Sequence, residues 1–460
     1  MQEPVQHKSI DEICAEIREL YKRFPQPWVI GYSGGKDSTT VLQMVWYALA
    51  ELPESERQKP VYVIASDTKV ETPVIVRYID GTLALVNSRA RECNMPFVAQ
   101  KVEPTLNDSF WVNLLGRGYP APTTKFRWCT DRLKIRPSTR FIEEKVAVCG
   151  EVILVLGIRQ SESSTRSQLM NSYKIGDHVL RRNGSTPGAY IYAPIADMST
   201  DEVWTYLQQV SSPWGGDNRK LVALYRNASA GECPLVIDDS TPSCGTSRFG
   251  CWVCTVAQRD YSMEAMIDKG EEWLEPLLEF RDELAKTSDP ARKHEYRDIR
   301  GRDGRVLFNK DNVAVARTFK LQASKDLLRQ LLRAQRQLSD QNVTLISEEE
   351  LLEIRRIWRI EREDWEDSVA SIYAEVHGSP PPWPKDDNEF FGSAEKELLE
   401  SFCRGHSVPF EVVAKLLEAE RASLGMARRA GVFKEIRKIL QQEWRDEAQI
   451  LGSLEDAGTG

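Results

Sequence analysis

A six-residue glycine-rich segment, Ser-Gly-Gly-Lys-Asp-Ser, places the strongest constraint on the fold of this chain. It covers residues 33–38 and lies between an apolar run, Trp28–Tyr32, and a helical pattern. Two glycines allow the backbone to approach an anion closely, and the first turn of a helix presents free N–H groups. Ser33, Lys36 and Ser38 add side-chain donors. The segment therefore predicts a phosphate-binding loop between a buried strand and a helix, with a nucleotide as its ligand.

The loop does not follow the Walker pattern of kinases and GTPases. That pattern requires G-x-x-x-x-G-K-[ST], and no stretch of this chain supplies it. A kinase or GTPase function is therefore disfavoured.

The composition is typical of a soluble protein of two or three domains. Of the 460 residues, 41% are hydrophobic, which is enough for an ordinary buried core. A net charge of −8 argues against general coating of nucleic acid, although a local basic patch is compatible with it. No apolar run approaches the roughly 18 residues of a membrane span, and residues 1–13 lack the basic and apolar regions of a signal peptide. We expect a cytoplasmic protein with no membrane partner.

Apolar runs alternate with helical patterns along the first half of the chain. Residues 60–65, 96–99 and 152–156 are further buried-strand candidates, a lead helix is expected over residues 9–23, and Ser199 is a candidate N-cap of a short helix. This alternation predicts an α/β fold whose parallel sheet carries helices on both faces, with ligands beyond the carboxyl ends of the strands. The phosphate-binding loop occupies such an end.

The character of the sequence changes twice after this region. A turn-rich joint at residues 211–216 precedes a cysteine-rich stretch, and from about residue 260 the sequence becomes charged and helical, with apolar stripes at helical spacing. We therefore expect a nucleotide-binding domain over residues 1–210, a cysteine-rich segment over residues 211–260 and an α-helical C-terminal region over residues 261–460.

Two other strand ends carry polar side chains. Asp67 and Thr68 directly follow the second strand, where they would meet a ribose or a Mg²⁺ ion. A carboxylate that caps its own turn is the alternative for Asp67. Arg159 and Arg166 follow the fourth strand and would bind phosphate oxygens, unless they are ordinary exposed cations.

Residues 125–137 form a strongly basic segment around Cys129. Five cations stand there against one acid, which favours a phosphate-bearing partner; the candidate contacts are Arg127, Arg132, Lys134 and Arg136. Cationic neighbours favour the Cys129 thiolate and make it a candidate nucleophile or sulfur carrier. Packing as a small apolar side chain is the alternative.

Four cysteines are clustered at Cys233, Cys244, Cys251 and Cys254. Tetrathiolate sites bind either structural Zn²⁺ or an iron–sulfur cluster. Zinc ribbons usually carry two Cys-x-x-Cys pairs, whereas this segment has one, so the spacing favours a [4Fe-4S] cluster and leaves zinc as the alternative.

The motifs together resemble a known family. The loop residues Ser33, Gly34, Gly35, Lys36, Asp37 and Ser38 are similar to the PP-loop of ATP pyrophosphatases. Residues 127–137, 157–166 and 193–195 are similar to signatures of phosphoadenylyl-sulfate reductases. The resemblance implies an adenine-nucleotide alpha hydrolase-like sheet domain in which the loop holds ATP phosphates, with Lys36, Asp37 and Ser38 acting in catalysis. It also implies that Asp67, Thr68, Arg159 and Arg166 line the same cleft.

With the cysteine cluster and the helical region included, the chain resembles the DndC family of ATP pyrophosphatase subunits, which act in bacterial DNA phosphorothioation. That resemblance implies ATP, Mg²⁺ and a [4Fe-4S] cluster as cofactors. It implies DNA as substrate, with a cysteine desulfurase as sulfur donor and other Dnd subunits as partners. A sulfonucleotide reductase, an iron–sulfur-dependent tRNA thiolase and a nucleotide-gated scaffold without turnover are the alternatives.

Overall fold

The structure is a computed structural model of the 460-residue chain and describes residues 8–160, 179–184, 186–227, 250–310, 313–383, 391–421, 423, 430–445 and 450. The chain divides into two compact units. Unit 1 comprises Met1–Thr105 and Pro122–Leu278, and unit 2 comprises Leu106–Ala121 and Glu279–Gly460. The three-part division expected from the sequence places its boundaries at 210 and 260 instead.

Unit 1 is built around a six-stranded sheet with the strand order β3-β2-β1-β4-β6-β5. Neighbouring strands pair in parallel, except β5 and β6, which are antiparallel. The strands are β1 (Trp28–Gly31), β2 (Val61–Ser66), β3 (Phe97–Val102), β4 (Val152–Val155), β5 (Arg181–Arg182) and β6 (Ala189–Tyr192). The four strands expected from the sequence are confirmed, and the last two are additional.

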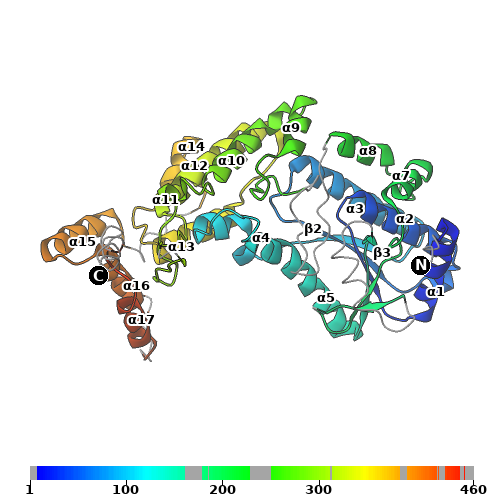
Figure 1. Ribbon diagram of the computed structural model, residues 1–460, viewed down its shortest axis with the longest axis horizontal. Coiled ribbons are helices and arrows are strands. Elements are labelled where there is room, and N and C mark those ends of the chain that lie inside the picture. The colour runs from blue at the N-terminus through cyan, green and yellow to red at the C-terminus, as the bar shows by residue number, and fades with distance from the viewer. Residues whose placement is uncertain are drawn as a thin grey trace. The chain divides into compact units, whose positions relative to one another are not determined.

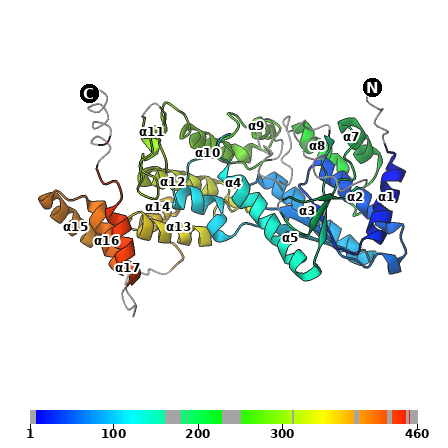
Figure 2. The ribbon, with the colours of Figure 1, turned by 60° about the horizontal axis from the view of Figure 1, so that its bottom comes forward.

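Helices cover both faces of this sheet (Figures 1 and 2). Alternate strand residues point to opposite faces: Ile30 and Val63 belong to one core cluster, whereas Val29 and Ile64 belong to another. The first face carries α1 (Ile10–Arg23), α2 (Lys36–Ala50), α3 (Pro73–Glu92), α7 (Thr200–Gln209) and α8 (Asn218–Asn227), and the second carries α5 (Arg136–Cys149). The short helix α4 (Trp128–Thr130) and α9 (Tyr261–Asp268) complete the helices described in unit 1. The expected fold class is confirmed.

The described part of unit 2 is mainly helical. Its helices are α10 (Glu275–Lys286), which spans the boundary, α11 (Lys293–Tyr296), α12 (Leu321–Gln337), α13 (Glu348–Glu361), α14 (Ser368–His377), α15 (Ser393–His406), α16 (Phe410–Arg421) and α17 (Ala430–Leu440). Leu328, Leu331, Ile354 and Trp358 from the predicted apolar stripes are buried. None of the described helices is both long and apolar enough to span a membrane.

Residues 106–121 belong to unit 2, although the rest of that unit begins only at Glu279. The buried indole of Trp111 donates to the carbonyl oxygen of Leu345 at 2.6 Å. The guanidinium of Arg362, whose pKa burial lowers to about 10, donates to the carbonyl oxygen of Leu115 at 3.1 Å. Buried donors of this kind require acceptors, so these contacts hold the segment in place.

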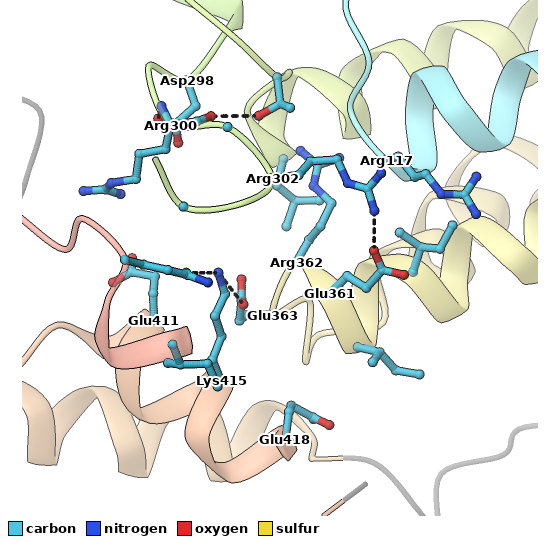
Figure 3. Close-up of a pocket in the computed structure, with 18 of the residues that line it drawn as sticks. Arg117, Asp298, Arg300, Arg302, Glu361, Arg362, Glu363, Glu411, Lys415 and Glu418 are labelled. Atoms are coloured by element: carbon cyan, nitrogen blue, oxygen red, sulfur yellow. Dashed lines mark hydrogen bonds and ion pairs between the residues drawn. The ribbon is translucent and has the colours of Figure 1, made fainter. Parts of the chain in front are cut away.

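A charged pocket of about 500 Å³ lies within unit 2. Figure 3 shows Glu363 and Lys415 facing each other in it, with 3.9 Å between Lys415 Nζ and Glu363 Oε1. That carboxylate oxygen is buried and has no hydrogen-bond partner among the residues that the structure describes. Burial raises the pKa of Glu363 to about 7, against the opposing effect of Lys415. The pocket therefore contains a carboxyl group that titrates near neutral pH.

The replacement Glu363→Gln is expected to change how stability depends on pH. The folded-state pKa of this acid lies above its unfolded value, so its contribution to stability is complete below about pH 4.5 and is lost as pH rises through about 7, a difference on the order of 3 kcal/mol. The variant should therefore gain stability relative to the natural chain at pH 8 but not at pH 5, measured by thermal unfolding. Glu411→Gln, at an exposed residue of the same pocket, is the control. An equal change of both variants at pH 8 would contradict the assignment.

Candidate functional site

The loop at residues 33–38 joins β1 to α2, as expected. The Ser38 hydroxyl closes the loop, because it accepts from the N–H of Ser33 at 3.2 Å and donates to the carbonyl oxygen of Gly35 at 3.0 Å. Gly34 has a φ of +75°, and a Cβ at this position would lie 2.9 Å from the Ile79 side chain on α3. Both the left-handed backbone and the packing against α3 therefore favour glycine at position 34.

Asp37 lies between two buried cations. Its carboxylate accepts from Lys36 Nζ at 2.7 Å and from Arg159 Nε at 2.6 Å, and each of the three residues is at most 6% exposed. Arg159, which follows β4, also donates to the Thr200 hydroxyl at the start of α7 (3.0 Å). This group lies beside the N-terminus of α2. The helix dipole there favours an anion.

Gly157 allows the two loops to meet. A Cβ at this position would lie 2.8 Å from the carbonyl carbon of Asp37 and 2.9 Å from the backbone nitrogen of Ser38. The chain after β4 therefore packs directly against the first turn of α2. Gly157 is the first residue of the signature-like segment 157–166, but its packing role against α2 was not predicted.

Asp67 caps its own turn. Its carboxylate accepts from the backbone N–H of Lys69 at 2.8 Å and pairs with Lys101 Nζ at 2.9 Å, and the residue is 7% exposed. Partial burial opposes the ionised form of Lys101, but its hydrogen bonds to Asp67 and Asp80 raise its pKa to about 12. The geometry is that of the turn-capping alternative, and a contact of Asp67 with ribose or Mg²⁺ stays a prediction.

Cys251 and Cys254 lie on one turn at the carboxyl end of β2. The N–H of Cys254 donates to the carbonyl oxygen of Cys251 at 3.0 Å, and both residues are partly exposed. Cys251 Sγ lies 3.4 Å from the hydroxyl of Thr68. Cys233 and Cys244 lie outside the described residues, and within those residues no group of three or more His, Cys, Asp or Glu side chains is arranged to hold a metal. The two thiols on one turn fit half of a tetrathiolate site.

The basic segment is attached to the same turn. Lys134 is buried and lies 3.6 Å from the carboxylate of Glu71, which forms a β-bridge with Cys251. Arg136, in contrast, is half exposed and pairs with a carboxylate on its own segment. That Lys134 and Arg136 bind a phosphate-bearing partner stays a prediction. Cys129 lies in α4 and is partly exposed.

Three other arginines were predicted to contact phosphate. Arg127 directly precedes α4, and Arg132 belongs to the π-helical turn Asp131–Ile135. Arg166 lies outside the described residues.

Tyr225 was not predicted from the sequence, yet it contacts the loop directly. Its hydroxyl, on α8, accepts from the backbone N–H of Lys36 at 3.0 Å. No local pattern in the sequence points to this contact.

The replacement Gly157→Ala is expected to damage the loop selectively. The added Cβ would meet the backbone of Asp37 and Ser38, which cannot give way as a flexible side chain can, so the first turn of α2 must shift. We expect a loss of stability of about 1–3 kcal/mol and a loss of binding of a non-hydrolysable ATP analogue, measured by thermal unfolding and calorimetry. Gly81→Ala is the control, because a Cβ there meets open space. Unchanged binding in the Gly157 variant would contradict the packing argument.

Two parts of the chain match known families. Residues 27–257, half of the chain, match the phosphoadenosine phosphosulfate reductase domain, and residues 394–441 match a small protein found in certain Dnd DNA modification systems. The chain is 26% identical over 238 residues to an uncharacterized protein of Methanocaldococcus jannaschii. The alignment covers 52% of this chain and 38% of that protein, so the chain spans well under two thirds of this relative.

Solved structures with distant similarity include two enzymes. One is the NH3-dependent NAD synthetase of Campylobacter jejuni in complex with nitrate, at 14% identity over 63% of this chain and 96% of that chain, with a TM-score of 0.27. The other is the U34-tRNA thiolase NcsA of Methanococcus maripaludis with its [4Fe-4S] cluster, at 13% identity over 62% of this chain and 80% of that chain, with a TM-score of 0.27. The family assignment rests on the match over residues 27–257: this chain belongs to the phosphoadenosine phosphosulfate reductase domain family.

Proposed function

We propose that this chain is an ATP pyrophosphatase and sulfurtransferase of the DndC type, which activates DNA backbone phosphate for phosphorothioation. The observation that carries the proposal is the anion-binding arrangement at the start of α2, where Lys36 and Arg159 converge on the loop through Asp37. The match of residues 394–441 to a Dnd-associated small protein supports DNA modification as its context. A sulfonucleotide reductase would account for the family match but not for this second match.

Activation is needed because a phosphate oxygen is a poor leaving group. A non-bridging oxygen of the DNA phosphate would attack the α-phosphorus of ATP and form a new P–O bond. The bond between the α-phosphorus and the oxygen that bridges it to the β-phosphorus would break, and pyrophosphate would leave. A cysteine desulfurase delivers sulfur as a persulfide, so two electrons from a thiol reductant would bring it to the sulfide level. That sulfide would then bond to the DNA phosphorus, the bond from this phosphorus to the activated oxygen would break, and AMP would leave with that oxygen. Lys36, together with Mg²⁺, would offset the charge that develops on pyrophosphate.

The other predicted residues are given roles within this reaction. Arg159 and Arg166 would bind ATP phosphates, and Asp67 and Thr68 would lie near the ribose or the metal ion. The half-exposed Arg136, with Arg127 and Arg132, would hold the DNA phosphate. Lys134 would fix the Cys251 turn through Glu71. Cys129, which is partly exposed, would carry sulfur.

The first test follows the phosphates of ATP. Incubation with ATP and duplex DNA should produce AMP and pyrophosphate, separated by chromatography from ADP and orthophosphate. Lys36→Ala should lower pyrophosphate release by about 100-fold or more, because it removes a cation from the charge that develops in the reaction. Lys22→Ala, at an exposed cation on α1, should leave the rate unchanged. Formation of ADP, or full activity in the Lys36 variant, would contradict the proposal.

The second test concerns the cysteine segment. Cys233, Cys244, Cys251 and Cys254 would hold a [4Fe-4S] cluster, with structural zinc as the alternative. Protein purified without oxygen should contain iron and acid-labile sulfide in equal amounts, and Cys251→Ser should lower both. Cys149→Ser, at an exposed cysteine outside the segment, should lower neither. Zinc in place of iron and sulfide would refute the cluster.

A further inference from the structure

Tyr225 occupies a hydrogen-bonding position that a bound phosphate needs. The first N–H groups of a helix have no partner within the helix, and these groups bind phosphate in loops of this kind. In this structure the N–H of Lys36, the first residue of α2, donates to the Tyr225 hydroxyl at 3.0 Å. Tyr225 is only 6% exposed. The donor is therefore satisfied by a buried side chain from α8.

The ring of Tyr225 is held in place on two sides. Lys36 Nζ lies 5.9 Å from the ring centroid, within the range of a cation–π interaction. The ring of Trp204, on α7, packs edge-on against that of Tyr225, with 4.8 Å between the centroids. Tyr225 thus contacts both the backbone and the side chain of the residue expected to bind phosphate.

The far end of α8 is tied down independently. Asn218, its first residue, accepts from the Gln43 side chain of α2 at 2.8 Å and donates to the carbonyl oxygens of Leu207 and Val210 at 2.9 Å each. Tyr225 lies about two helical turns further along. The contacts of Asn218 do not involve Tyr225, so displacement of the Tyr225 hydroxyl does not require them to break.

We infer that the Tyr225 hydroxyl holds the place of a phosphate oxygen, and that a triphosphate must displace Tyr225 to bind the Lys36 N–H. The inference rests on the ATP site proposed above. A single N–H serves one well-aligned acceptor, so hydroxyl and phosphate oxygen exclude each other there. Phosphate wins the exchange because it brings charge to the helix N-terminus and to the cations Lys36 and Arg159, whereas the hydroxyl is neutral.

The test is Tyr225→Phe, which keeps the ring and removes the competing hydroxyl. Calorimetry with α,β-methylene-ATP and Mg²⁺ should show about two- to tenfold tighter binding than in the natural chain, as expected for the loss of one neutral competitor. The control is Tyr47→Phe, on the same helix α2, because that hydroxyl donates to the carbonyl oxygen of Ser211 instead; its affinity should not change. Weaker or equal binding in the Tyr225 variant would overturn the inference, since the hydroxyl would then contact the nucleotide or not compete with it.

Tryptophan fluorescence provides a second readout of the displacement. Binding of the analogue should change the emission of Trp204 as the edge-on contact with Tyr225 is lost, and Trp204→Phe should abolish that part of the signal. Binding without a Trp204-dependent change would also overturn the inference. Failure of the analogue to bind either the natural chain or the Tyr225 variant would instead refute the ATP site itself, so the two failures are distinguishable.

Discussion

The position of Asp37 between Lys36 and Arg159 is the interaction on which the rest of the site depends. Two buried cations side by side would repel each other, and each loses hydration on burial, so their proximity requires a carboxylate between them. Asp37 supplies it and thereby connects the loop after β1 to the loop after β4. Arg159 extends the connection to Thr200 at the start of α7. Asp37 and Arg159 thus join three segments at the carboxyl edge of the sheet.

Much of the fold could be predicted because its signals are local. Buried parallel strands appear as short apolar runs, and the four runs found in the sequence are β1 to β4. Ser199 was a predicted N-cap, and it forms a capping box with Glu202 at the start of α7. The strands β5 and β6 escaped prediction because β5 has two residues and β6 follows a turn-rich stretch that indicates a break.

The site was predictable only where its residues belong to a motif. Residues 33–38 and Arg159 were found from their places at strand ends, and the structure brings them together. Tyr225 and Lys101 were not found, because their contacts join positions far apart in sequence and leave no periodic pattern. A single acid after a strand, such as Asp67, does not reveal its role, because residues that bind ligands and residues that cap turns show the same sequence pattern. The pairing of Asp67 with Lys101 is visible only in the three-dimensional structure.

The integration of residues 106–121 into unit 2 means that the backbone passes between the units at three places. A fragment that ends at Leu278 would keep Trp111 but lose Leu345, the acceptor of its indole. A fragment that begins at Glu279 would keep Arg362 but lose the carbonyl oxygen of Leu115. Expression of either half alone would leave buried polar groups without their hydrogen-bond partners. Dissection of this protein would therefore need residues 106–121 to be supplied to the C-terminal half, for example by covalent linkage ahead of α10.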